Sequence, residues 1–174
     1  MKILEIRRHS IRTTGGDHLN QKGVTLARKI GQGIGPFDFV ATSTLPRAFE
    51  TAIAMGFAVS EQNDLMSTYG AAVEREAPWP LPFFHYSEIV KQDGAAAEYA
   101  YQLMDYYLDI MDRIPTGGSA MVVNHGGVVE LGTVACLSDA DFGPWGDAAD
   151  YCEGARLFWD DGRFVRGEVL RLPK

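Results

Sequence analysis

The sequence predicts an α/β fold, a three-layer α/β/α sandwich around a mostly parallel central sheet. Strand-like apolar runs alternate with helix-like runs along most of the chain, which is typical of parallel βαβ units. The length of 174 residues and the hydrophobic content of 46% fit one globular unit with a substantial core, so we expect a single domain over 1–174. No apolar run approaches the ~18 residues of a membrane span.

The first third of the chain predicts two βα units. Residues 1–6 predict the start of a strand, and they lack the long apolar stretch and cleavage site expected of a signal peptide. Thr44 is the expected N-cap of the second helix, and Pro46 stands in its first turn. In order, the expected elements are a strand at 3–7, a helix at 19–33, a strand at 37–42, a helix from Thr44 through Met55, and a short strand at 57–60.

Residues 61–93 have the least regular pattern, and we expect a long specificity loop there. Three prolines alternate with aromatic residues around Trp79, and the aromatic content argues against disorder. The run 78–86 fits two descriptions equally well, one wall of a substrate site or a rigid cover on the core.

The last part of the chain predicts a helix, a buried strand, a second helix and a hairpin. A long apolar-periodic run ends at Pro115, and Asp161-Gly162 is a two-residue hairpin signal. The expected ranges are a helix at 95–114, a strand at 120–124, a helix at 128–137, and hairpin strands at 155–160 and 164–172.

Charge is unevenly distributed along the chain. Residues 1–50 carry eight Lys and Arg against four Asp and Glu, a net charge of +4, while the remainder carries −11. A nucleic-acid or membrane-surface binder should be basic over a broad face, so neither partner is expected. Cys136 and Cys152 have no metal or disulfide spacing, which predicts two reduced thiols in a cytoplasmic protein.

The candidates for catalytic or binding residues lie in three short segments. His9 and His125 each come directly after a strand-like run, where α/β folds place their active sites. Taken alone, each fits an ordinary surface or glycine-rich turn as well. Arg47 stands in the first turn of a helix, where the helix dipole disfavours a cation unless an anion binds there. Together the three segments predict one anion pocket.

Four motifs, in order along the chain, resemble those of the histidine phosphatase superfamily, whose members have phosphoglycerate mutase-like folds. The resemblance covers 3–52 and 119–137 well, and 61–115 only in outline. The family's Arg-His-Gly appears as Arg8-His9-Ser10, its Leu-Thr-x-x-Gly as Leu19-Asn20-Gln21-Lys22-Gly23, its Ser-x-Leu-x-Arg-Ala-x-x-Thr-Ala as Ser43 to Ala52, and its His-Gly-Gly as His125-Gly126-Gly127.

The resemblance implies that His9 is a nucleophile that becomes transiently phosphorylated, while Arg8, Arg47 and His125 hold the phosphoryl group. Planar guanidinium groups suit the oxygens of that group, and nearby arginines keep the attacking imidazole neutral. We expect His125 to be the charged, donating imidazole. Gly126 should allow close approach of the backbone to the phosphate, and Arg12 matches an Arg-His-Gly-x-Arg variant of the motif.

Two departures from the family pattern concern catalysis. Ser10 replaces the usual glycine, which we expect to be tolerated unless that position needs a positive φ. Many members also place a glutamate in a Leu-x-Glu setting after the third strand, where this chain has Leu65-Met66-Ser67. Glu74, Glu76 and Glu88 are the alternatives for a general acid. Glu74 is the first choice because Tyr69-Gly70 precedes it as an aromatic-Gly pair does in the family.

The sequence therefore predicts a cofactor-independent phosphatase that hydrolyses a small phosphorylated substrate through a phosphohistidine at His9. A catalytically weak phospholigand-binding protein and a phosphomutase are the alternatives, and a phosphoprotein substrate stays open. No metal is expected, because neither His18 nor His85 has neighbours with ligand spacing, and the GxG at 31–33 ends a helix instead of opening one. The physiological substrate and the oligomeric state are not readable from the sequence.

Overall fold

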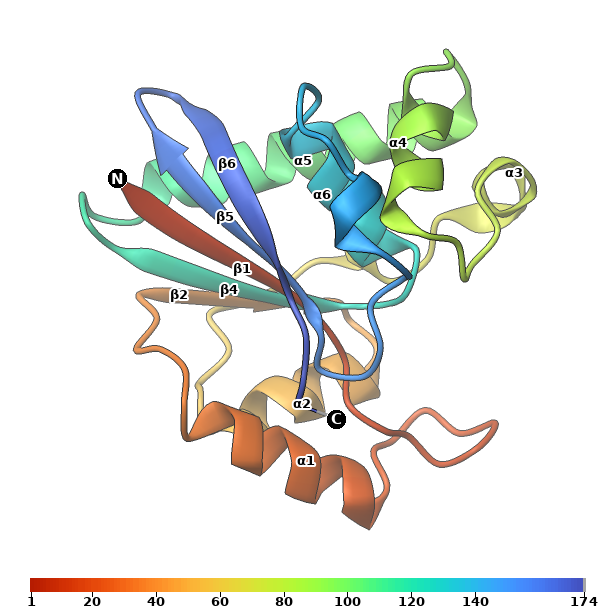
Figure 1. Ribbon diagram of the computed structural model, residues 1–174. Coiled ribbons are helices and arrows are strands. Elements are labelled where there is room, and N and C mark those ends of the chain that lie inside the picture. The colour runs from red at the N-terminus through yellow and green to blue at the C-terminus, as the bar shows by residue number, and fades with distance from the viewer. Residues whose placement is uncertain (174) are drawn as a thin grey trace.

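The computed structural model describes residues 1–173, which form a six-stranded sheet with helices on both faces (Figure 1). The strands are β1 (Lys2–Arg8), β2 (Phe39–Thr42), β3 (Glu61–Gln62), β4 (Ser119–Asn124), β5 (Gly154–Asp160) and β6 (Arg163–Leu170). The helices are α1 (Gln21–Gly31), α2 (Pro46–Met55), α3 (Gly70–Glu76), α4 (Phe83–Val90), α5 (Ala95–Arg113) and α6 (Val128–Cys136).

The strand order is β3-β2-β4-β1-β5-β6, and only β5 runs against the other five. The predicted three-layer α/β/α fold with a mostly parallel sheet is therefore confirmed. The predicted hairpin is also present, because β5 and β6 pair antiparallel around Asp161 and Gly162, which both have positive φ as a type I′ turn requires.

The two faces of the sheet bury separate apolar clusters. Alternate residues of β4 point to opposite faces, so Met121 and Val123 pack towards α1 and α2, while Ala120 and Val122 pack towards α5 and α6. Helix α6 has buried residues on every side, because it lies between α5, α4 and the sheet. None of the helices described is long and apolar enough to cross a membrane.

Two expectations for the first half were wrong in detail. The third strand lies at Glu61–Gln62, not at 57–60, because Phe57 packs edge-on against Phe37 with ring centroids 5.0 Å apart. Thr44 is not the N-cap of α2, since Leu45 holds that position with no side-chain cap. The hydroxyl of Thr44 instead bonds the side chains of Asp64 and Ser67.

The segment 61–93 is structured, contrary to the irregular loop that the sequence predicts. It contains β3, a 3₁₀ turn at Asp64–Met66, and helices α3 and α4. The last proline of this segment, Pro82, occupies the N-cap position of α4, so the proline-rich run leads into a helix. Phe83 and Tyr86 are fully buried, whereas Trp79 is 38% exposed.

Candidate active site

His9 and His125 are brought together by the parallel pairing of β1 with β4. Arg8 and Asn124 are register partners at the carboxyl ends of these strands, and the N–H of His9 donates to the carbonyl of Asn124 at 2.9 Å. The next residue of each chain segment is a histidine, so the two imidazole rings have centroids 5.2 Å apart. Both side chains are buried, with 4% and 8% exposure.

The hydrogen bond of His9 selects its tautomer. Its Nδ1 lies 2.7 Å from the carbonyl oxygen of Ser10, which can only accept, so Nδ1 carries the hydrogen. The lone pair is then on Nε2. A ring held in this way is oriented for nucleophilic attack through Nε2.

Ser10 is accommodated by contacts of its own. It is fully buried, its hydroxyl donates to the carbonyl of Gly23 at 2.7 Å, and its N–H donates to Thr51 Oγ1 at 2.9 Å. Its φ is not among the positive values of the backbone, so no glycine is required there. The serine therefore fixes the turn that follows His9 without straining it.

His125 is held by a serine that the sequence analysis did not single out as functional. Ser43 Oγ lies 2.7 Å from His125 Nε2 and also accepts from the N–H of Leu45 at 3.3 Å. Ser43 directly follows β2, whose register with β4 aligns Thr42 with Val123. With the serine hydroxyl donating to Nε2, Nδ1 carries a hydrogen that has no partner among the described residues.

Three arginines surround the two histidines. Arg8 is 9% exposed, and the Arg47 side chain is 15% exposed. Burial lowers the pKa of Arg47, and repulsion from Arg12 and then Arg8 lowers it further against the opposing effect of Asp17. The Nε atoms of Arg8 and Arg47 are buried without hydrogen-bond partners within 1–173. Crowded cations with unpaired donors are suited to the binding of an anion.

Aromatic side chains fix the orientation of Arg8. Its Cζ lies 4.2 Å from the centroid of the Tyr151 ring and 4.5 Å from that of Trp79. A side chain at Gly126 would collide with Trp79, because a Cβ built there lies 2.4 Å from the indole. Trp79 thus forms one wall of the site, as one of the two descriptions of 78–86 proposed, while Phe83 and Tyr86 belong to the core.

The turn after His125 needs its second glycine for two reasons. Gly127 has a φ of +86°, and a Cβ built there would lie 2.9 Å from the Tyr69 ring. Its N–H donates to the fully buried carboxylate of Glu130 at 2.6 Å, so this N–H is already engaged. Of the two glycines, Gly126 lines a cavity of about 400 Å³ together with Arg47 and His125.

The three candidate acids have different surroundings. Glu74 is exposed on α3 and lines the cavity of Arg47 and His125. Glu76 accepts from the N–H groups of Ala95 and Ala96 and so caps α5. Glu88 forms a surface ion pair with Lys91 at 2.7 Å. Of the three, Glu74 alone lines the cavity that holds Arg47 and His125.

Burial and nearby positive charge favour the neutral form of both histidines. Burial lowers the pKa of His9 to about 3, and repulsion from the three arginines acts in the same direction. Burial, then His9 and the arginines, lowers the pKa of His125 to about 2. The expectation that His125 is a charged imidazole is therefore wrong for the free protein, although a neutral ring still donates one hydrogen bond.

Acid should destabilise the protein through these two groups. Their folded pKa values lie below the ordinary value of 6.5, so the unfolded state takes up protons first as pH falls. Their contribution to stability is present above pH 6.5 and is lost as pH falls from there towards about 3. We expect the unfolding midpoint between pH 7 and 4.5 to fall more steeply in the wild type than in a His9→Asn/His125→Asn variant, measured by circular dichroism. Parallel curves would contradict this.

Taken together, these observations describe an α/β protein in which two buried histidines and a cluster of arginines meet at the carboxyl ends of parallel strands. Solved structures of the histidine phosphatase superfamily have the same fold. A phosphoserine phosphatase from Entamoeba histolytica in complex with 3-phosphoglyceric acid superposes with a TM-score of 0.70 at 16% identity, over 99% of this chain and 98% of that one.

Two further solved structures have the same fold. A phosphoglycerate mutase from Bacillus anthracis str. Sterne has a TM-score of 0.65 at 18% identity over 94% of this chain and 90% of its own. A mycobacterial glucosyl-3-phosphoglycerate phosphatase complexed with VO3 has a TM-score of 0.69 at 18% identity over 98% of both chains. No protein-family model and no curated protein matches the sequence. The phosphoglycerate mutase-like fold is thus confirmed.

Proposed function

We propose that the chain is a phosphatase that hydrolyses a small phosphorylated substrate through a phosphohistidine at His9. The observation that carries the proposal is the pairing of a neutral His9, with its lone pair on Nε2, with unpaired buried donors on Arg8, Arg47 and His125. The neighbours of this fold that are named as phosphatases support the same class of reaction. We propose that no cofactor takes part and that 1–174 acts as one domain in the cytoplasm.

In the first step, His9 Nε2 attacks phosphorus and the bond from phosphorus to the ester oxygen breaks. The guanidinium groups of Arg8, Arg12 and Arg47 stabilise the charge on the phosphoryl oxygens, and His125 Nδ1–H donates to one of them. Glu74 gives its proton to the leaving oxygen. Glu74 then takes a proton from water as the water attacks phosphorus, and cleavage of the P–N bond returns neutral His9 and inorganic phosphate.

Two features of the sequence favour the alternative of a catalytically weak phospholigand-binding protein. The contacts of Ser10 and the position of Glu74 weaken both arguments. Ser10 fits its position through hydrogen bonds, and Glu74 offers a carboxyl in the cavity where the Leu-x-Glu acid is missing. Hydrolysis of a chromogenic aryl phosphate in EDTA tests the proposal. Phosphate release supports it; phosphate binding without turnover on a broad panel would favour the binding protein, and transfer between two hydroxyls of one substrate would identify a mutase.

Replacing Glu74 by glutamine should slow poor leaving groups far more than good ones. General acid catalysis contributes typically about 10²–10⁴-fold, so kcat for an alkyl phosphate should fall by about 10²-fold or more. Hydrolysis of p-nitrophenyl phosphate, whose leaving group needs no proton, should fall by less than about tenfold. Steady-state kinetics on the two substrates measure the difference.

Glu88→Gln is the matched control, because Glu88 forms a surface ion pair with Lys91 and lines neither cavity of the site, and it should leave the hydrolysis of both substrates unaffected. Glu76→Gln should lower the unfolding midpoint through the loss of the α5 cap, with little change in kcat. Wild-type rates on alkyl phosphates in all three variants would show that the acid assignment is wrong.

A further inference from the structure

Four exposed carboxylates surround the arginine cluster, and we call them the acidic rim. Two of them form ion pairs with the arginines proposed to hold the phosphoryl group, at 3.5 Å to Arg47 and 3.3 Å to Arg8. The other two line the cavities that adjoin these arginines. In chain order the acidic rim consists of Asp17, Glu74, Asp147 and Asp150.

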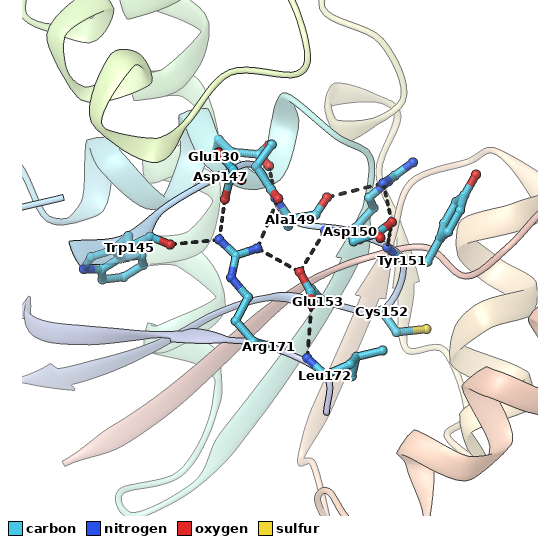
Figure 2. A network of polar contacts seen from close by, with 12 residues as sticks. Glu130, Trp145, Asp147, Ala149, Asp150, Tyr151, Cys152, Glu153, Arg171 and Leu172 are labelled. Atoms are coloured by element: carbon cyan, nitrogen blue, oxygen red, sulfur yellow. Dashed lines mark hydrogen bonds and ion pairs between the residues drawn. The ribbon is translucent and has the colours of Figure 1, made fainter. Parts of the chain in front are cut away.

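The part of the rim beside Arg8 is held in place by a hydrogen-bond network (Figure 2). The Arg171 guanidinium donates to the backbone carbonyls of Trp145, Asp147 and Ala148 and forms an ion pair with Glu153 at 2.8 Å. Glu153 in turn accepts from the N–H of Asp150 at 3.0 Å. Hydrogen bonds and an ion pair therefore hold the loop that carries Asp147 and Asp150.

Buried Glu130 anchors the same loop from the other side. One of its carboxylate oxygens accepts from Ala149 N–H at 2.8 Å (Figure 2). The other accepts from Gly127 N–H at 2.6 Å, which ties the loop to the turn after His125. Asp150 Oδ1 accepts from Tyr151 N–H at 2.7 Å and lies 3.3 Å from Arg8 Nη1. The carboxylate is thus oriented by backbone contacts as well as by the arginine.

Beyond the phosphoryl cluster, the cavities offer no positive charge. The cavity of about 400 Å³ beside Arg47 and His125 presents Glu74 and the polar side chains of Ser67, Thr68 and Tyr69. The cavity of about 360 Å³ beside Arg8 presents Asp147 and Asp150. Among the described residues that line these two cavities, Arg8 and Arg47 are the sole Lys or Arg side chains. The nearby Arg171 is engaged by Glu153 and by carbonyl groups.

From this arrangement we infer the substrate class of the proposed phosphatase: a monoester of a small neutral or amine-bearing alcohol, in which the phosphate is the sole anionic group. This inference rests on the proposed function. The inner arginines and histidines accept one dianion, and the rest of the substrate meets hydroxyls and carboxylates. A second carboxylate on the substrate would face the like charges of Asp17, Asp147 and Asp150 with no cation to pair it, whereas an ammonium group would find a partner among these three residues.

Two pairs of substrates test the inference, and in each pair one member has a carboxylate that the other lacks. Phosphoethanolamine is phosphoserine without its carboxylate, and glycerol 3-phosphate has CH₂OH where 3-phosphoglycerate has COO⁻. We expect kcat/KM to favour the member without the carboxylate by about tenfold or more in each pair at low ionic strength. The preference should shrink in about 1 M salt, where the Debye length falls to ~3 Å, whereas a steric preference would persist.

Substitutions in the acidic rim should change the ratio of kcat/KM values within each substrate pair, and substitutions elsewhere should not. Asp150→Asn keeps an acceptor for Tyr151 N–H, and Asp17→Asn removes the exposed partner of Arg47, so each should reduce the preference several-fold. Asp139→Asn changes net charge equally on an exposed turn outside both cavities and should leave the ratio unchanged. Equal effects of all three substitutions would overturn the assignment to the rim.

Equal or greater kcat/KM for phosphoserine and 3-phosphoglycerate would overturn the inference while leaving the phosphatase intact, since p-nitrophenyl phosphate would still be hydrolysed. Absence of turnover on every substrate would instead contradict the proposed function. Dissociation constants of the four compounds, measured by calorimetry on the His9→Ala variant, keep the inference falsifiable in that case. Tighter binding of the carboxylated members would contradict it without any reference to catalysis.

Discussion

Replacement of His9 by alanine is expected to abolish hydrolysis of p-nitrophenyl phosphate in EDTA. His9 is the nucleophile in the proposed mechanism, and loss of a covalent nucleophile reduces kcat by roughly 10³-fold or more in comparable enzymes. The buried His125 cannot replace His9 as the nucleophile through Nε2, because that atom is hydrogen-bonded to Ser43 Oγ. The rate of p-nitrophenol release under saturating substrate is the measurement.

The control must separate loss of the nucleophile from loss of the fold. The His9→Asn variant retains a donor within reach of the Ser10 carbonyl, which the wild-type Nδ1–H contacts at 2.7 Å. It should remain folded by circular dichroism, bind inorganic phosphate and be equally inactive. Activity close to that of the wild type in either variant would exclude His9 as the attacking group.

Arg47→Ala should produce the second largest loss. Its half-buried side chain lines a cavity together with His125, and an arginine that stabilises the transition state of phosphoryl transfer is worth roughly 10³–10⁵-fold in kcat. We expect a fall of about 10³-fold in kcat, with partial recovery when free guanidinium is added. Arg47→Lys should recover less, because an ammonium cannot form two parallel hydrogen bonds to phosphoryl oxygens.

Arg28→Ala is the matched control, because Arg28 is exposed near the end of α1 and lines neither cavity of the site. It should have the activity of the wild type. Unchanged kcat in Arg47→Ala, or an equal loss in Arg28→Ala, would show that Arg47 does not stabilise the transferred group.

Local patterns predicted most of the fold and the centre of the site, because both depend on how strands end. His9 and His125 were recognisable since each follows a strand-like run, and parallel neighbours end at the same sheet edge. Arg47 was recognisable because a cation in the first turn of α2 needs an anion. These inferences need only the sequence near each residue.

Contacts between distant segments were not predictable in the same way. Trp79 and Tyr151 both stack on Arg8, yet they are separated by 72 positions and come from segments with no strand pattern of their own. Tyr151 reaches the site because β5 lies antiparallel beside β1, which places the start of β5 next to the end of β1. Nothing in the sequence near Tyr151 specifies that pairing.

Other errors arose where a side chain had competing partners. Thr44 has the right chemistry for an N-cap, but its hydroxyl bonds Asp64 and Ser67, which a local pattern does not include. The apolar run at 57–60 looked like a strand, but Phe57 packs on Phe37 instead of entering the ladder. In the same way, a local pattern does not show that burial, His9 and the arginines lower the pKa of His125, which disfavours the charge expected there.

The proposed mechanism depends above all on a covalent bond between phosphorus and His9. Rapid acid-free quenching of the wild type with an aryl phosphate, followed by peptide mass spectrometry, tests it most directly. We predict one phosphoryl group on the peptide that contains His9, stable in base, lost in acid, and absent from the His9→Asn variant. Turnover with no phosphorylated His9 peptide at any quench time, or a phosphoryl group on another residue, would contradict the mechanism.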